Sequence, residues 1–233
     1  MKALLFLLSF LLLLCSCASE QPGRLQPLAP DPMRPLEQAE LKKKCAAVYP
    51  QGKWQFVHAI EFSMAGGGGS SVLGVTVVDG NSLSCALMTV EGFTLFEARL
   101  TDRLEVDRAV PPFDRPGFAE GLMEDVRALF IRPDGSGVRY GQLADGVESC
   151  RMTGPDGAVT DILPLENGCR RIKTYDAEGL LTRTITGRSC RKAGPTVIPE
   201  ALELTVPGPA GYTLKMTLLS VDGPTVNTSE MIR

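Results

Sequence analysis

Short segments in which every second residue is apolar, separated by glycine turns, run through most of this 233-residue chain. In residues 54–62, for example, Trp54, Phe56 and Ile60 alternate with smaller or more polar neighbours. A period of two predicts β-strands. Connections as short as residues 79–81 leave no room for a crossover helix, so neighbouring strands must run antiparallel. The sequence therefore predicts a mostly β (α+β) protein with about twelve strands, at residues 54–62, 72–78, 83–90, 93–100, 104–110, 138–143, 147–153, 159–163, 170–175, 180–186, 201–206 and 212–221.

Two segments have helical periodicity instead. In residues 36–48, Leu41, Cys45 and Val48 recur at spacings of four and three, and fall on one face. Residues 117–131 form the stronger amphipathic pattern, with most charged residues away from the apolar stripe. A chain of this length suits one substantial core, so residues 36–233 are expected to form a single domain.

Some central strands are apolar on both faces. In residues 72–78, Leu73, Val75 and Val77 point one way, while Val72 and Val78 point the other. A sheet with one wet face would alternate cleanly, so this sheet is covered on both sides or its second face meets something apolar. With only two helices predicted, one face is expected to curl around a cavity that the helix at 117–131 closes. A packed β core without a usable void is an equal alternative.

The first seventeen residues predict export. Lys2 precedes an apolar run, residues 3–14, that is too short to cross a bilayer and is typical of a signal peptide. The ending Leu14-Cys15-Ser16-Cys17 resembles the lipobox of bacterial lipoproteins. That resemblance implies that residues 1–16 are removed and that Cys17 carries a diacylglyceryl group, with ordinary secretion as the alternative.

Residues 18–35 lie between the lipidated cysteine and the predicted domain. They contain five prolines and few bulky side chains, which predicts an extended tether. Ala18 is not the aspartate that retains such lipoproteins in the inner membrane of enteric bacteria. We therefore expect a monomer anchored in the outer membrane through its lipid and facing the periplasm.

Composition argues against several classes of function. Loss of Lys2 leaves 23 basic and 27 acidic residues, a net charge of −4 without a basic stripe, so no nucleic-acid partner is expected. The only histidine, His58, lies on an apolar strand face, where a core role is favoured. Glycines 66–69 lack the ending of a phosphate loop, and no Gly-x-Ser-x-Gly occurs. Scattered carboxylates leave a glycosidase-type pair open. Nothing singles one out, so an enzyme is the third hypothesis, and neither a metal nor another cofactor is expected.

Seven cysteines reduce to five available thiols, because Cys15 leaves with the signal and Cys17 is lipidated. At most two disulfides are possible, and their connectivity cannot be deduced from five candidates. Cys169 and Cys190 flank the hairpin predicted at residues 170–186, so a bridge between them would clamp its base.

The order of elements and a few sequence strings resemble a known family. The strands open with Trp54-Gln55-Phe56, residues 88–98 read MTVEGFTLFEA, and Pro111-Pro112-Phe113-Asp114 precedes the amphipathic helix. Over residues 36–225 the chain is similar to uncharacterised bacterial lipoproteins grouped with the LolA/LolB superfamily of lipoprotein carriers and receptors. The resemblance implies a curved, incomplete antiparallel barrel (a LolB-like half-barrel) with helices in its mouth.

In that superfamily, LolA-like members carry acylated lipoproteins, and anchored LolB-like members receive them. LolB-type receptors also have a protruding loop with an exposed leucine between two early strands. The matching connections here, residues 79–81 and 91–92, are short turns, which leaves Phe113 as the nearest substitute.

These expectations combine into one leading hypothesis, the binding of lipid or lipoprotein acyl chains in a hydrophobic half-barrel. It predicts an apolar cavity of several hundred Å³ between sheet and helix, the usual size of a ligand pocket. A non-catalytic docking module of an envelope complex, with a filled interior and an outer apolar patch, is the alternative. The candidate ligand contacts are, on the wall, Trp54, Phe56, Ile60, Phe62, Leu73, Val75, Val77, Leu95 and Phe96, and, on the helix and the loop before it, Phe113, Phe118, Leu122, Val126 and Phe130.

Overall fold

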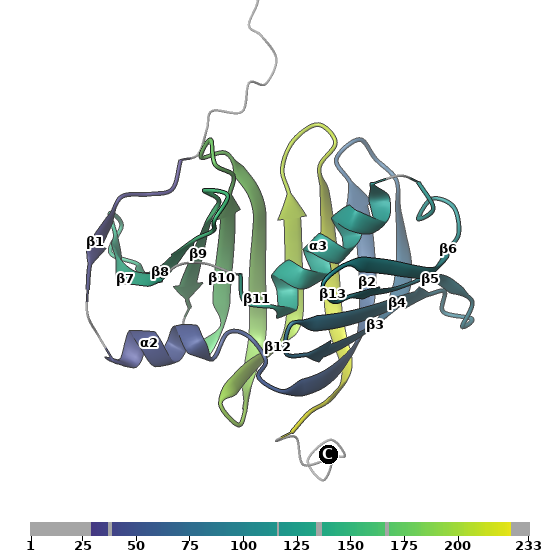
Figure 1. Cartoon of the computed structure of the whole chain (residues 1–233), viewed down its shortest axis with the longest axis horizontal. Coiled ribbons are helices and arrows are strands. Elements are labelled where there is room, and N and C mark those ends of the chain that lie inside the picture. Colours follow the sequence, from purple (N-terminus) through teal and green to yellow (C-terminus); the bar gives the residue numbers. More distant parts are fainter. Residues whose placement is uncertain (1–28, 37–38, 116, 134–136, 166–167, 225–233) are drawn as a thin grey trace, which may run out of the picture.

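A computed structural model describes residues 29–36, 39–115, 117–133, 137–165 and 168–224 of the chain. This part of the chain forms one antiparallel sheet of 13 strands that does not close into a barrel (Figure 1). Across the sheet, β1 pairs with β7, strands β7 to β13 follow in sequence order, and β13 pairs with β2, which leads on to β6. The strands are β1 (Met33–Pro35), β2 (Lys53–Met64), β3 (Gly69–Asp79), β4 (Ser82–Met88), β5 (Thr94–Leu100), β6 (Leu104–Ala109), β7 (Val138–Leu143), β8 (Glu148–Thr153), β9 (Val159–Pro164), β10 (Arg170–Tyr175), β11 (Leu181–Ala193), β12 (Thr196–Val206) and β13 (Tyr212–Asp222).

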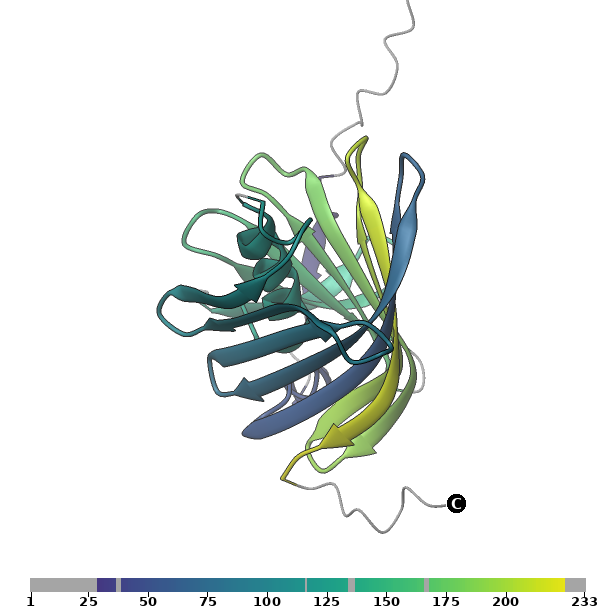
Figure 2. The same ribbon diagram turned by 90° about the vertical axis from the view of Figure 1, so that its right-hand side faces the viewer.

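In the described part of the chain, two helices accompany the sheet. The longer one, α3 (Phe118–Phe130), lies inside the curve of strands β2 to β5, and Figure 2 shows the sheet bending around it. The shorter one, α2 (Ala39–Ala46), packs against β8 and β9 in the other half of the molecule. The predicted fold, a curved and open antiparallel sheet with one main helix on its concave face, is confirmed.

The domain begins before the predicted boundary at residue 36. Met33–Pro35, assigned to the tether from the sequence, form β1 at one edge of the sheet and pair with β7. An edge strand tolerates Pro35 because one side of the strand needs no ladder hydrogen bonds. The tether prediction for residues 18–28, the signal peptide and Cys17 lie outside the described residues.

Strands β11 and β12 are longer than the sequence predicted. Their pairing continues past residue 186 to a turn at Gly194, which has φ of 60°. The added stretch is polar, includes Ser189 at a positive φ, and faces Pro199 across the hairpin. It therefore lacks the alternation by which strands are recognised.

The pairing of β2 with β3 shows which residues lie on the concave face of the sheet. Opposite Trp54, Phe56 and His58 on β2 lie Val78, Thr76 and Gly74 on β3. These even-numbered residues are buried, whereas Leu73, Val75 and Val77 on β3 are only half-buried. The hydrophobic core therefore fills the concave side, between the sheet and α3.

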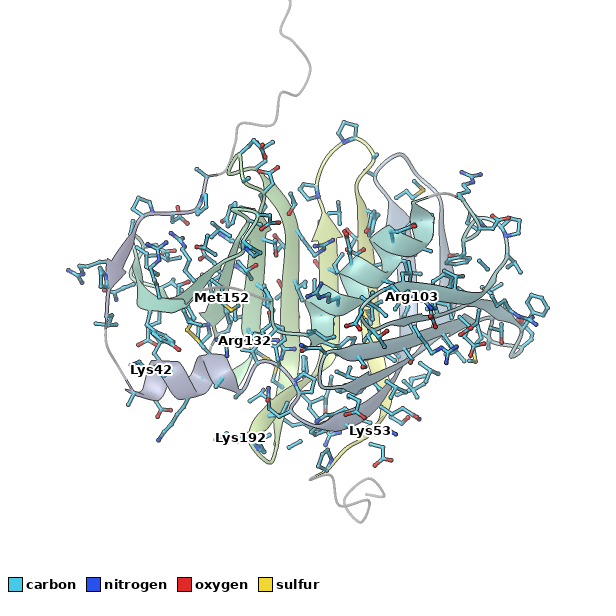
Figure 3. The ribbon with its side chains drawn as sticks, viewed as in Figure 1. Lys42, Lys53, Arg103, Arg132, Met152 and Lys192 are labelled. Atoms are coloured by element: carbon cyan, nitrogen blue, oxygen red, sulfur yellow. A yellow bond between two sulfur atoms is a disulfide. The ribbon has the colours of Figure 1, made fainter. Side chains whose placement is uncertain are left out.

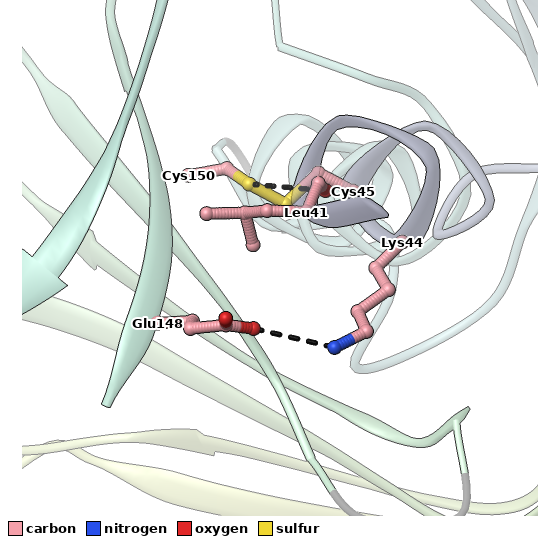
Figure 4. Close-up of a disulfide and its surroundings, with 5 residues drawn as sticks. All are labelled: Leu41, Lys44, Cys45, Glu148 and Cys150. Carbon is pink, nitrogen blue, oxygen red and sulfur yellow. Dashed lines mark hydrogen bonds and ion pairs between the residues drawn. A yellow bond between two sulfur atoms is a disulfide. The ribbon is translucent and has the colours of Figure 1, made fainter. Parts of the chain in front are cut away.

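Two disulfides hold the half of the sheet that contains β7 to β11. One joins Cys45 on α2 to Cys150 on β8, at a sequence separation of 105, and Leu41 is fully buried beside it (Figure 4). Lys44 and Glu148 add an exposed ion pair at 3.3 Å. The other joins Cys169 to Cys190, the pair proposed from the sequence, and ties the start of β10 to β11. Cys85 is a buried free thiol.

Candidate ligand site on the concave face

Helix α3 is attached to the middle of the sheet by one buried carboxylate. Asp125 is only 2% exposed. Its Oδ1 accepts a hydrogen bond from Arg183 Nε on β11 at 2.8 Å, and its Oδ2 accepts one from the hydroxyl of Tyr212 on β13. Burial and the bond to Asp125 raise the pKa of Tyr212, so this hydroxyl remains a donor. We call these three residues the Asp125 cluster.

Aromatic side chains line the space between β2 and α3. The rings of Trp54 and Phe56 stack with centroids 5.9 Å apart, and Phe130 of α3 stacks on Phe56 at 4.9 Å. His58 continues the row, with its ring 6.0 Å from that of Phe130. We call Trp54, Phe56, His58 and Phe130 the aromatic row. It offers flat apolar surface to whatever occupies the concave side.

The structure brings ten of the predicted contact residues to this side. Trp54, Phe56 and Phe96 are buried in the core. The ring of Phe113 packs against the rings of Phe96 and Phe118. The ten residues that lie on the concave face, on α3 or on the loop before it are Trp54, Phe56, Ile60, Phe62, Phe96, Phe113, Phe118, Leu122, Val126 and Phe130. Their contact with a ligand stays a prediction.

The remaining four predicted wall residues are on the wrong side. Leu73, Val75 and Val77 lie on the convex face, and Leu95 precedes the inward-facing Phe96 and is not part of the core. On β3 the apolar pattern could not show which face is concave, because both faces carry apolar residues. The concave positions are partly the small or polar Gly74 and Thr76. At Gly74 a Cβ would lie 2.5 Å from Cδ1 of Ile60, so a larger residue there would have to displace the end of the Ile60 side chain.

The interior contains less space than the sequence suggested. No apolar cavity of several hundred Å³ separates α3 from the sheet in the described residues, because side chains of the helix fill the concave side. A small cavity remains near the C-terminal end of α3. Its volume is about 10 Å³, which is enough for roughly one water molecule. Its lining includes Phe56, His58, Phe130, Arg170, Thr196 and Leu202.

Polar groups gather around this cavity. The buried atoms without a hydrogen-bond partner in the described chain include Tyr49 Oη, His58 Nδ1, Arg170 Nε and Thr196 Oγ1. Burial lowers the pKa of His58 to about 4, so the imidazole is neutral. Burial also raises the pKa of Tyr49 to about 12, against smaller opposing effects of Arg170 and of Arg132, which lies just beyond α3 (Figure 3). Sequence analysis anticipated a buried His58 but none of the other three, because they come from three separate segments.

Arg170 differs from Arg151, the other buried arginine in the described chain. It is 3% exposed, and within the described part of the chain its side chain donates one hydrogen bond, from Nη1 to the carbonyl of Val197 at 3.2 Å. Burial lowers the pKa of its guanidinium to about 10, which still leaves it charged at neutral pH. By contrast, Arg151 is paired with Asp161, with two hydrogen bonds of 2.6 Å.

Two apolar side chains are exposed at the turn between β4 and β5. Val90 is 72% exposed and Phe93 is 56% exposed. The turn is closed by a hydrogen bond of 2.9 Å from Thr89 N to Phe93 O. Phe113, which the sequence offered as the exposed substitute, is instead half-buried between two aromatic rings.

The chemistry of the described residues is otherwise sparse. They contain no group of three or more His, Cys, Asp or Glu side chains that could hold a metal ion. Among the helices of this part of the chain, none has the length and apolar character needed to cross a bilayer.

Comparison with known proteins finds similarity in structure only. No family model and no curated protein sequence matches the chain. A LolA superfamily protein from Nitrosomonas europaea superposes with a TM-score of 0.52 over 81% of this chain and 96% of its own, at 13% identity. The chain has the LolA-like fold. A domain from Vibrio parahaemolyticus assigned to outer membrane lipoprotein sorting gives a TM-score of 0.48 at 12% identity, covering 78% of this chain and 90% of its own.

The predicted resemblance to the LolA/LolB superfamily is confirmed at the level of fold, while the exposed apolar turn lies at a connection that the sequence had dismissed as too short.

Proposed function

We propose that this chain is an outer-membrane lipoprotein that binds acyl chains of lipids or lipoproteins between α3 and the concave face of its sheet. The observation that carries the proposal is an amphipathic helix lying over an aromatic row in the mouth of an open, LolA-like sheet. An acyl chain needs only dry apolar surface, and no catalytic group.

Binding requires α3 to move, because its side chains occupy the concave side. The described residues on either side of the helix, 110–115 and 131–133, are not helical, and the Asp125 cluster attaches the helix to the middle of the sheet. Breaking such a buried pair costs about 3 kcal/mol. Burying sixteen methylene groups gains more than roughly 10 kcal/mol. The hydrocarbon therefore has enough free energy to displace both the cluster and part of the helix packing.

The exposed turn between β4 and β5 supports exchange of the ligand with a membrane. Val90 and Phe93 are exposed to water at its tip, so no packing contacts are given up when their side chains enter lipid. Together with the anchor at Cys17, this turn would bring the mouth of the half-barrel against the bilayer.

Photolabelling tests the binding site. A chain of residues 18–233 retains every described residue and is incubated with palmitate that carries a diazirine on its alkyl chain. We expect labels on Phe56 and Phe130 and none on Leu73, Val75 or Val77, mapped residue by residue by mass spectrometry. The convex face serves as the internal control, and labels confined to it would refute the proposed site.

One observation favours a docking module as the second candidate. The interior is largely filled, and the convex face carries a half-exposed apolar strip made of Val57, Leu73, Val75, Val77, Ala86 and Met88. If this strip docks on an envelope protein, Val75→Lys abolishes assembly into a larger complex on native gels of membrane extracts and leaves palmitate binding intact.

The anchor is tested separately. Cells fed an alkyne palmitate are expected to label the full chain but not Cys17→Ser, and the labelled protein is expected in outer-membrane fractions of a density gradient. Equal labelling of both chains would remove the anchor from the proposal.

A further inference from the structure

The cavity under the end of α3 has a polar side that acyl-chain binding alone does not explain. Eleven residues line it, and Arg170 is the only charged one among them. A buried charge is costly unless it is paired and hydrogen-bonded. Elsewhere in the described chain this rule is obeyed, since Arg151 pairs with Asp161 and Arg183 pairs with Asp125. Among the described residues, no carboxylate forms an ion pair with Arg170, so its charge calls for an anion.

The groups beside Arg170 are hydrogen-bond donors. Thr196 brings a hydroxyl to the cavity wall, and His58, being neutral, has one ring N–H to offer. Tyr49 is buried next to Arg170, between two residues that line the cavity. These groups come from four segments of the chain, namely β2, the α2–β2 connection, β10 and β12. Three of them, His58, Arg170 and Thr196, line the same buried cavity, which makes it a candidate site for an oxyanion.

The framework of this site is held firmly. The Cys169–Cys190 disulfide fixes the start of β10, where Arg170 lies. Val197 N donates a hydrogen bond of 3.0 Å to Ala47 O, which ties β12 to the segment that carries Tyr49. A site held in place before its ligand arrives loses little entropy on binding.

The rest of the lining is apolar and belongs to the proposed acyl site. Phe56 and Phe130 of the aromatic row border the cavity together with Leu202. An anion seated at Arg170 would therefore place the first carbons attached to it against these side chains. The small size of the cavity favours the smallest oxyanion head, because a carboxylate needs less room than a phosphodiester with its two ester arms.

We propose that Arg170, with His58, Thr196 and Tyr49, binds the carboxylate of an unesterified long-chain fatty acid whose alkyl chain occupies the space under α3. This inference rests on the proposed function and narrows its ligand. Guanidinium and carboxylate form paired, charge-assisted hydrogen bonds, whereas an esterified or amide-linked acyl chain offers no anion. The site would then distinguish free fatty acids from the acyl groups of lipoproteins.

Competition for a fluorescent fatty acid tests the proposal with residues 18–233 in the oxidised form. The competitors are palmitate, hexadecanol and hexadecyl phosphate. We expect palmitate to bind at least about tenfold more tightly than hexadecanol. In Arg170→Met, this preference should disappear while hexadecanol binding remains. The matched control is Arg171→Met, because Arg171 is the exposed neighbour on the same strand.

Stability distinguishes a binding role from a structural one. Because Arg170 is buried without a carboxylate, Arg170→Met should leave the melting temperature unchanged or higher. If Arg170→Met does not fold, Thr196→Val removes one donor without changing shape and should weaken palmitate several-fold more than hexadecanol.

Each other outcome has a clear meaning. Equal affinity for palmitate and hexadecanol overturns the carboxylate site and leaves acyl-chain binding intact. Preference for hexadecyl phosphate over palmitate overturns the carboxylate assignment in favour of a phosphate head. Failure of all three competitors overturns the proposed function itself.

Discussion

The two halves of the sheet are held together by different means. Strands β7 to β11 carry both disulfides and the buried Arg151–Asp161 pair, and α2 is covalently tied to β8 (Figure 4). Strands β2 to β6 have no disulfide among their described residues; α3 packs over β4 and β5, and the Asp125 cluster links the helix to β11 and β13. The first half is therefore a rigid frame, and the second carries a helix that can be displaced. The polar cavity lies where the two meet.

The largest expected effect comes from removing the disulfide between α2 and β8. Cys45→Ala with Cys150→Ala opens a 105-residue loop and should lower the free energy of unfolding by about 4 to 5 kcal/mol. Removing Cys169–Cys190, which spans 21 residues, should cost roughly 3 kcal/mol. Urea unfolding of both double variants measures the difference. Cys85→Ala is the control for loss of a buried sulfur. If the first pair costs no more than this control, the frame is not held by its cross-link.

A smaller effect is expected at the attachment of α3. Asp125→Asn removes the charge that balances Arg183 and should lower the free energy of unfolding by about 3 kcal/mol. More importantly, amide hydrogen exchange should rise in α3 and stay unchanged in β8 to β10, because only the helix loses an anchor. Glu124→Gln is the matched control, since Glu124 is the exposed neighbour on the same helix. Uniformly faster exchange in both halves would contradict a separately displaceable helix.

The single histidine gives a pH-dependent comparison at the boundary between the halves. His58 keeps a folded-state pKa of about 4, below the usual 6.5, because burial disfavours its charged form. The unfolded chain therefore takes up the proton first, and stability present above pH 6.5 is lost as the pH falls towards 4. Between pH 7.5 and 5 we expect a loss of about 2 kcal/mol.

His58→Phe, which keeps a ring in the aromatic row, should remove this slope. Urea unfolding at several pH values between 5 and 7.5 measures it for both proteins. An unchanged slope in the variant would mean that other groups titrate in this range and that His58 is not the source.

Part of this structure could be predicted from the sequence. Strand positions were predictable wherever glycine turns bracket clean alternation, and the residues of α3 followed from its apolar stripe. The assignment of Leu73, Val75 and Val77 failed because β3 is apolar on both faces. Only pairing with β2 determines which face turns inward. Arg170, Thr196 and Tyr49 gave no local signal, because their meeting depends on how β10, β12 and the α2–β2 connection are arranged in space.

The smallest effect on stability is expected at the turn between β4 and β5, in the half that carries α3. Val90→Ser and Phe93→Ser change exposed side chains, so the free energy of unfolding should shift by no more than about 0.5 kcal/mol. Binding of residues 18–233 to phosphatidylglycerol vesicles, measured by flotation, should nevertheless fall several-fold, because the apolar tip inserts at the lipid surface. The matched control is Leu180→Ser, an exposed apolar residue at a turn of the frame, which should leave vesicle binding unchanged. If the substitutions at both turns reduce vesicle binding equally, any exposed apolar residue contributes to adhesion. The turn in the half that carries α3 would then not be a specific membrane contact.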